Sequence, residues 1–406
     1  MDLDLDPDFA AARRPRRSKR KKKERQESHD KMQQANKFAR MVSSPVLSWV
    51  CRLVTLCSGM EAVVQGYEHM HIPLEHEVAC DSDKNCRRVI EHNFNPRVCF
   101  DDVATIDVDQ VPEHDMLWAG APCQPFSSAG LGEGLTDKSG RGIVMLHILR
   151  IIKAKVPKVV ILENVSNIRS SKHRATFESV LEILREIRMR RPGGPDAFYH
   201  VEWNVMNTCN YGLPQSRQRV YIVCVRSDVL QRPLQWPAPS PSQLDIDSLL
   251  GERPSQMIVS KALPPQKSTT TRANVLAGLE FLRQCGAKPF EETWIMNIDD
   301  SPNRMSKPLK GCSPCLTRAR AARGGHWVTT HGCRMGTETM LKLQGMDPDR
   351  IKRPSDVKLG LFNAMIGNAM SVNVVEVLLA MLSRSCPQVL NAKKPLPLPC
   401  QWATFD

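Results

Sequence analysis

Short apolar segments alternate with amphipathic segments between residues 53 and 226. The apolar segments are typical of buried strands, and examples are RLVTLC, HEVAC, DMLWAGA, KVVILE and RVYIVCV. The amphipathic segments repeat apolar residues at helical spacing, as in GIVMLHILRIIKAK and RATFESVLEILREIRMR. Strands that alternate with helices in this way predict an α/β fold, a doubly wound and mostly parallel sheet with helices on both faces.

The alternation stops after the last of these strands, and this divides the chain. Residues 1–50 are charged and then polar without any period, which predicts a disordered basic arm. Residues 51–231 carry the alternating pattern. The segment RPLQWPAPSPSQ opens a Pro-rich, weakly periodic region, for which we expect a smaller domain over residues 232–315. Helical periodicity returns in residues 316–390, whose last helix is apolar enough to pack back on the sheet, and residues 391–406 form a tail.

Composition and charge narrow the class of protein. With 41% hydrophobic and 24% charged residues the chain is typical of soluble globular proteins, and we expect no membrane span, which needs ~20 apolar residues. The net charge of +13 is concentrated, because residues 13–25 hold ten Lys or Arg and one acid. Such a run is either a solvated arm or a nuclear address and nucleic-acid-binding tail. We favour the second interpretation, with the nucleus as the location.

The 14 cysteines do not form the compact framework of a small disulfide-rich protein, so we expect reduced thiols. Cys312 and Cys315 have the CxxC spacing of zinc ligands, and His326, His331 and Cys333 follow. A second tight pair of ligands is missing, and we therefore expect no metal site.

Three strand ends carry groups that suit an adenosine-containing cofactor, since ligands of open α/β sheets bind at the carboxyl ends of strands. The first strand runs into LCSGMEA, where Gly59 allows close backbone approach, although a glycine there is often only a turn. The second ends in ACDSD, where Asp81, or alternatively Asp83, could bind a ribose hydroxyl. The third ends in FDDVATID, where Asp102 could accept from an adenine amino group. The chain has no GxGxxG or GxxxxGK[ST], which argues against a dinucleotide or a P-loop nucleotide.

The strand end WAGAPCQPFSSAG places Cys123 on a turn that prolines brace on both sides. A single cysteine is by default a buried structural residue. Here, however, a loop with Gly130, Gly132 and Gly134 follows, and a rigid nucleophile beside a mobile lid suits an enzyme that closes over its substrate.

Two further candidates follow. Glu163, after KVVIL, is either an acid at a partly buried strand end or a helix cap or surface acid. Arg217 and Arg219, in PQSRQR, would present two guanidinium groups on one face of an extended segment, which suits an anion. The alternative for the arginines is a solvated edge.

The order of these motifs resembles that of the S-adenosylmethionine-dependent cytosine-5 methyltransferase family, over residues 52–231 and 311–385. GAPCQPFSSAG is similar to the catalytic loop of the family, ENV to its acid motif and PQSRQR to its QxRxR motif. LCSGMEA, ACDSD and FDDV resemble the cofactor-binding segments, and RMGTETMLKLQGM and AMIGNAMSVNVV the last two motifs. The four motifs PCQ, ENV, QxRxR and GN in this order are a specific combination.

The resemblance implies a Rossmann-like methyltransferase fold with a target-recognition domain over residues 232–315. It implies that the Cys123 thiolate attacks carbon 6 of a flipped cytosine and that Glu163 holds and protonates ring nitrogen 3. Arg219 would support the cytosine oxygen and Arg217 the phosphate side, with Gln124 and Asn164 bracing the loops. The residues implied for the cofactor are Leu56, Cys57, Gly59, Met60, Asp81, Ser82, Asp102, Val103, Pro122 and Asn368.

The chain departs from the family pattern at three cofactor positions. Cys57 stands where the family usually has an aromatic residue, Glu61 stands where it has a second glycine, and Ser82 often corresponds to an aromatic residue. We expect weaker stacking on the cofactor from these changes. They leave the catalytic positions intact.

DNA is the substrate that we favour, because the basic arm suits a long polyanion and the CFT signature of the tRNA-modifying branch is missing. Two alternatives stay open, an RNA cytosine methyltransferase and a non-enzymatic relative that only binds nucleic acid. Several cations of the 232–315 segment are candidates for phosphate contacts, namely Lys261, Lys267, Arg272, Arg304, Lys307 and Lys310. We expect a monomer, for which recruitment to chromatin would need a partner protein.

Overall fold

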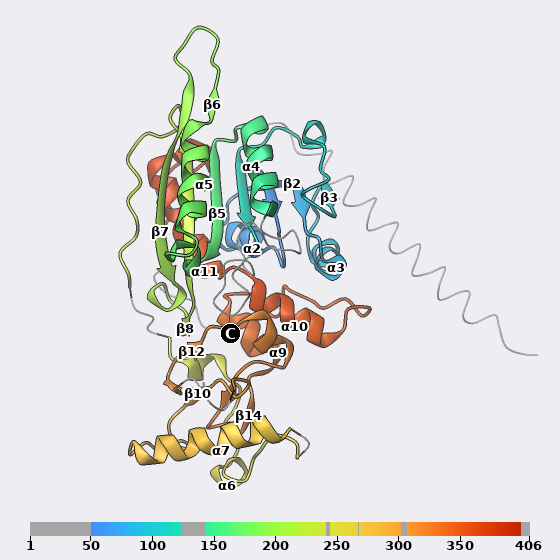
Figure 1. The fold of residues 1–406 in the computed structure, drawn as a ribbon, viewed down its shortest axis with the longest axis vertical. Coiled ribbons are helices and arrows are strands. Elements are labelled where there is room, and N and C mark those ends of the chain that lie inside the picture. The colour runs from blue at the N-terminus through green and yellow to red at the C-terminus, as the bar shows by residue number, and fades with distance from the viewer. Residues whose placement is uncertain (1–49, 123–142, 241–243, 267, 302–306, 399–406) are drawn as a thin grey trace, which may run out of the picture. The chain divides into compact units, whose positions relative to one another are not determined.

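A computed structural model describes residues 50–122, 143–240, 244–266, 268–301 and 307–398. The strands of its central sheet are β1 (Cys51–Leu56), β2 (Leu74–Cys80), β3 (Val98–Phe100), β4 (Met116–Gly120), β5 (Val159–Val165), β6 (Arg188–Met189), β7 (Ala197–Asn207) and β9 (Gln218–Arg226). Their order is β3-β2-β1-β4-β5-β9-β7-β6 (Figure 1). The first five strands of this order run parallel, and β9, β7 and β6 are antiparallel to their neighbours. This confirms the predicted α/β fold with a mostly parallel sheet.

The parallel strands β1, β4 and β5 are largely apolar because helices cover both faces of the sheet. All four residues of the segment from Val159 to Leu162 in β5 are buried, and so are most residues of β1 and β4. A strand buried on both faces has no polar side, which explains the continuous apolar runs in the sequence. The carboxyl ends of β1, β2, β4 and β5 consequently meet at one edge of the sheet.

Helices α4 (Val144–Lys155) and α5 (Arg174–Glu186) cover one face, and α2 (Ala62–His69) and α11 (Val372–Ser385) lie on the other (Figure 1). Helix α3 (Lys84–Asn93) lies near β2 and β3. The contact between α2 and α11 is close, because a methyl group on Gly66 would come within 2.6 Å of Val375 Cγ1. The sequence-distant α11 therefore packs into the main core.

The segment Leu359–Ser385 is long and apolar enough to cross a membrane by length and composition, which the sequence interpretation did not anticipate. However, 89% of its most apolar window is buried inside the protein. The structure divides the segment into α10 (Leu359–Asn368) and α11, with Ala369 and Ser371 in extended conformations between them. Its hydrophobicity is thus accounted for by burial in a protein core.

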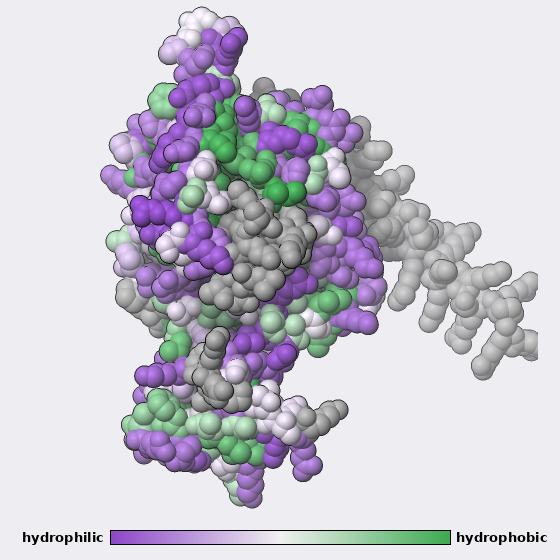
Figure 2. All heavy atoms as spheres, in the orientation of Figure 1, coloured by the Kyte–Doolittle hydropathy of each residue, from purple (hydrophilic) through white to green (hydrophobic). Residues whose placement is uncertain are grey.

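A smaller sheet lies apart from the central one. It contains β11 (Leu309–Lys310), β10 (Trp294–Met296), β13 (Trp327–Val328) and β14 (Cys333–Arg334) in this order, with α7 (Thr269–Gln284) alongside. Its own apolar core is made of Val275, Leu279, Leu282, Met296, Ile298 and Trp327. β13 and β14 lie beyond residue 315, so this sheet continues past the segment predicted as the smaller domain. Figure 2 shows apolar residues gathered over α7, where Leu276 and Phe281 are exposed.

Short helices and turns make up the rest of the described fold. The helices are α6 (Gln256–Val259), α8 (Arg318–Ala322) and α9 (Gly336–Leu343), and the 3-10 turns are η1 (Val108–Gln110), η4 (Ser166–Arg169), η5 (Thr208–Asn210), η6 (Ile246–Leu249) and η8 (Pro387–Val389). β8 (Gln215–Ser216) pairs in parallel with β12 (Ser313–Pro314). This pairing brings two segments about a hundred residues apart in sequence side by side, directly before Arg217 and Cys315.

Candidate active site

A cavity of about 270 Å³ lies at the carboxyl edge of the parallel strands. Seven of the residues predicted for the cofactor line it, namely Leu56, Cys57, Gly59, Asp81, Ser82, Pro122 and Asn368. The other three, which the structure also describes, do not. Met60 and Val103 are buried in the core, and the Asp102 carboxylate accepts the main-chain N–H of Ala104.

The loop after β1 is held against the end of β2 by Asp81. One carboxylate oxygen accepts the N–H of Gly59 at 2.9 Å, and the other accepts the N–H of Asp83 at 2.9 Å. Gly59 has a φ of 59°, in the left-handed region that favours glycine. Burial raises the pKa of Asp81, against these hydrogen bonds, which lower it. Asp83, the alternative candidate, caps α3 by accepting the N–H of Asn85.

Glu61 occupies a backbone conformation that suits glycine better. Its φ is 52°, it stands at the N-terminus of α2, and its side chain points into the protein, where the residue is 1% exposed. The Thr55 hydroxyl donates to its Oε1 at 2.9 Å and also lies 2.9 Å from His76 Nε2. Burial raises the pKa of Glu61 to about 8. The left-handed conformation explains in physical terms why a glycine suits this position, from which the chain departs.

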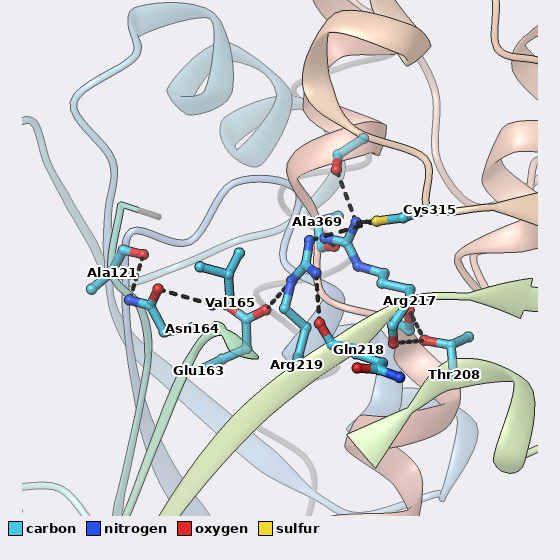
Figure 3. A network of polar contacts seen from close by, with 12 residues as sticks. Ala121, Glu163, Asn164, Val165, Thr208, Arg217, Gln218, Arg219, Cys315 and Ala369 are labelled. Carbon is cyan, nitrogen blue, oxygen red and sulfur yellow. Dashed lines mark hydrogen bonds and ion pairs between the residues drawn. The ribbon is translucent and has the colours of Figure 1, made fainter. Parts of the chain in front are cut away.

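Glu163 meets Arg219 across the boundary between the parallel and antiparallel parts of the sheet. The Arg219 Nε lies 3.0 Å from Glu163 Oε1 (Figure 3). In the register of β5 with β9, Val165 is opposite Arg219, so the two side chains converge from neighbouring strands. Glu163 is 8% exposed and lines the cavity, together with Arg219. Glu163 is thus neither a helix cap nor a surface acid.

Gly120, at the end of β4, pairs with Glu163 in the parallel register. A methyl group on Gly120 would lie 3.7 Å from Glu163 Oε2 and 3.0 Å from Met370 Cε. Asn164 ties the same strand ends together, because its Nδ2 donates to the Ala121 carbonyl at 3.4 Å and its Oδ1 accepts the N–H of Val165 (Figure 3). The end of β5 is therefore fastened to the residues that lead into the PCQ motif. Cys123 and Gln124 themselves lie outside the described residues.

Arg217 is 2% exposed, and so the alternative of a solvated edge is wrong for this residue. Its guanidinium group donates to the main-chain carbonyls of Leu316, Gly367 and Ala369 at 2.9, 3.2 and 2.7 Å. These carbonyls come from the segment before α8 and from the end of α10. Burial lowers the pKa of Arg217. Arg217 thereby fastens the C-terminal part of the chain to the site.

The CxxC pair does not point at a common ligand. The Cys312 thiol donates to the Ser313 carbonyl at 3.6 Å, whereas Cys315 Sγ lies 3.6 Å from Arg217 Nη1 and 4.0 Å from Arg219 Nη2. Over the described part of the chain, no group of three or more His, Cys, Asp or Glu side chains could hold a metal ion.

Sequence reasoning missed three residues at the site. Arg318 lines the cavity and lies 3.7 Å from Asp83, while Met370 contacts Gly120 and Cys315 contacts both arginines. Arg318 and Cys315 come from the segment that the pairing of β8 with β12 brings in, and Met370 follows α10. No periodicity or spacing in the sequence marks this contact between distant segments.

Comparison with known proteins agrees with this geometry. The family model described as C-5 cytosine-specific DNA methylase matches residues 51–384. The type II methyltransferase M.NgoBI of Neisseria gonorrhoeae is 31% identical over 343 residues, which are 84% of this chain and 96% of that protein. The type II methyltransferase M.HaeII of Haemophilus aegyptius is 27% identical over 331 residues, or 80% of this chain and 91% of that protein.

Solved structures share the fold. The Dnmt2 methyltransferase of S. pombe superposes with a TM-score of 0.54 and 16% identity over 82% of this chain and 98% of that chain. The Entamoeba histolytica methyltransferase EhMeth superposes with a TM-score of 0.56 and 16% identity over the same shares. At this level of identity the likeness concerns the fold alone.

Proposed function

The chain belongs to the C-5 cytosine-specific DNA methylase family, and from this premise we propose that Cys123 and Glu163 act together on a cytosine flipped out of DNA. The protein is a DNA (cytosine-5-)-methyltransferase, and its methyl donor is S-adenosylmethionine.

In the proposed mechanism the Cys123 thiolate adds to carbon 6 of the cytosine while the Glu163 carboxylic acid donates its proton to ring nitrogen 3. Carbon 5 becomes nucleophilic and takes the methyl group. Loss of the carbon-5 proton to solvent then expels the thiolate, and ring nitrogen 3 returns its proton to Glu163, which restores the aromatic ring. Cytosine is a poor electrophile, so that nucleophilic addition and ring protonation must be coupled. The base must leave the stack because carbon 6 is inaccessible in a duplex.

The observation that carries the proposal is a shared cavity. Glu163 and Arg219 line the same cavity as the loop at Gly59 and Asp81. Pro122, the residue before Cys123, lines it too. A proton donor, the entry to the nucleophile loop and a predicted cofactor surface thus face one space, as transfer between two bound molecules requires. Arg219, paired with Glu163, would support the cytosine oxygen, and Gln124 and Asn164 would brace the loops.

The cavity fits a cationic nucleoside. S-adenosylmethionine, when bound, supplies a methyl group on a positively charged sulfur. Asp81 presents a carboxylate to the cavity, whereas the neighbouring Asp83 lies 3.7 Å from Arg318. A methyl group on Gly59 would meet nothing within 4 Å, so the backbone there faces open space. We propose that Gly59, Asp81, Ser82 and Asn368 bind the donor and that Leu56, Cys57 and Pro122 form apolar walls. Roles for Met60, Asp102, Val103 and the phosphate contact of Arg217 stay predictions.

The experiment combines methylation with matched variants. Purified protein, S-adenosylmethionine and duplex DNA should give cytosine methylation that bisulfite sequencing detects, and tRNA in a parallel assay should stay unmodified. Methylated tRNA with unmodified DNA would favour the RNA alternative. Cys123→Ala and Glu163→Gln should each lose activity by at least about a hundredfold, whereas Cys312→Ser should retain it. Near-parental turnover by Cys123→Ala would refute the assignment, and a parent inactive on both nucleic acids would favour a binding-only relative.

The comparisons also bear on the predicted nuclear location and epigenetic role. The type II methyltransferases reported above come from bacteria, and they give no support to a nuclear location or an epigenetic role. The basic arm on which these predictions depend lies outside the described residues. The nuclear location, the chromatin partner and the monomeric state stay predictions.

A further inference from the structure

A second sulfur lies beside the proposed catalytic acid. Cys315 follows β12 and is partly buried. Its Sγ lies 3.6 Å from Arg217 Nη1 and 4.0 Å from Arg219 Nη2, and Arg219 in turn contacts Glu163 (Figure 3). The sulfur therefore sits at the point where both guanidinium groups of the QxRxR motif converge.

An ionised sulfur would balance the charges that the described residues bring to this cluster. Glu163 supplies one negative charge to Arg219. The partners of the Arg217 guanidinium are three carbonyl oxygens and Cys315, and within the described part of the chain no carboxylate comes within 4 Å of it. Among the described residues, the two guanidinium groups and the carboxylate of Glu163 carry one net positive charge, in a place where a buried charge is costly without a counter-ion.

We propose, on the premise of the proposed function, that the Cys315 thiolate is the counter-ion that holds the guanidinium groups of Arg217 and Arg219 together and positions Arg219 against Glu163. Cys315 is a positioning residue, because it acts on Glu163 through Arg219. Without the negative sulfur, the two guanidinium groups would repel each other, and Arg219 would be held less firmly against Glu163. Proton donation to the cytosine ring would then be slower.

The groups around the two cysteines explain why only one of them is suited to this role. Cys315 faces Arg217 and Arg219, the His326 ring lies against its main chain, and Glu163 is reached through Arg219. Burial would raise the pKa of the Cys315 thiol, but the two guanidinium groups lower it below its ordinary value. Cys312, three residues earlier, has no such cations among the residues that the structure describes, and burial raises its pKa to about 11.

Alkylation tests the charge of the sulfur without reference to activity. The folded protein is labelled with iodoacetamide at a series of pH values and then digested with trypsin. Trypsin should release residues 311–318 as one peptide that carries both Cys312 and Cys315, and fragment spectra assign the label to each cysteine. Labelling of Cys315 should reach its half-maximal rate at a lower pH than labelling of Cys312. Arg219→Gln should move the Cys315 midpoint upward and leave that of Cys312 in place. A Cys315 midpoint at or above that of Cys312, or no labelling of Cys315, overturns the proposal.

Methylation by Cys315→Ser tests the positioning role, with Cys312→Ser as the matched control. Serine keeps a polar atom but stays neutral, so the kcat of Cys315→Ser should be about tenfold below that of the parent at pH 8. On acidification the two kcat values should approach each other, because the parent thiol is then also neutral. If Cys315 had only a structural role, the ratio of the parent kcat to the Cys315→Ser kcat would not change with pH, and this result would contradict the proposal. Inactivity of the parent itself would refute the proposed function and leave the alkylation test standing.

Discussion

Glu61 gives the sharpest test of how burial acts at the cofactor loop. The side chain is fully enclosed, its Oε1 accepts from Thr55, and its Oε2 has no hydrogen-bond partner among the described residues. Burial accordingly raises its pKa from the ordinary 4.5 to about 8. Replacement by glutamine keeps the shape, the left-handed backbone and the acceptor for Thr55, but removes the titration.

The sign and size of the effect follow from proton linkage. Because the folded state binds the proton more tightly than the unfolded state, Glu61 contributes most to stability below pH 4.5. That contribution declines as the pH rises towards 8, by about 1.4 kcal/mol per pH unit. Between pH 5 and pH 8 the parent should therefore lose about 4 kcal/mol relative to Glu61→Gln. The neighbouring His76 does not obscure this window, since burial lowers its pKa to about 4.

Urea unfolding of the parent and of Glu61→Gln at pH values from 5 to 8.5 measures how the difference between their free energies of unfolding changes with pH. The two proteins should have similar free energies of unfolding at pH 5, and the variant should become progressively more stable above it. Glu178→Gln, at an exposed position of α5, is the control and should show no such trend. A difference between parent and Glu61→Gln that stays constant with pH would refute the reasoning.

Two other predictions concern packing and the cofactor. Gly66→Ala should lower the free energy of unfolding by about 1–3 kcal/mol, because the new methyl group would come within 2.6 Å of Val375 Cγ1, whereas Gly194→Ala, which meets nothing within 4 Å, should be neutral in the same urea titration. Asp81→Asn should weaken S-adenosylmethionine binding about tenfold in calorimetry, since a neutral amide holds the Gly59 N–H less strongly; unchanged affinity would remove Asp81 from the donor site.

The parallel part of the fold could be predicted from the sequence because burial on both faces leaves a direct signature. β1, β4 and β5 read as largely apolar runs that end in polar or glycine-containing loops. The directions of β9 and β7 could not be predicted in the same way, because an apolar run reads alike in a parallel and in an antiparallel strand. Yet it is the antiparallel pairing of β5 with β9 that brings Arg219 to Glu163.

Site residues that lie in recognisable motifs could be predicted from the sequence. Contacts between segments that are far apart in the sequence could not. Glu163 and Arg219 could be named from their motifs, and the structure places them in contact. Arg217 was expected beside an anion, but its guanidinium is enclosed by carbonyls of residues about 100 to 150 positions away. Cys315 reaches the site through the two-residue pairing of β8 with β12, which is too short to leave a pattern in the sequence.

The central claim is that Cys123 bonds transiently to a cytosine while Glu163 supplies a proton. The most direct measurement is mass spectrometry of the protein after incubation with S-adenosylmethionine and duplex DNA that contains 5-fluorocytosine, whose fluorine blocks the final elimination. The account predicts a covalent adduct on the peptide that contains Cys123, formed much more slowly by Glu163→Gln. An active enzyme that forms no adduct, or an adduct on another cysteine, would contradict it.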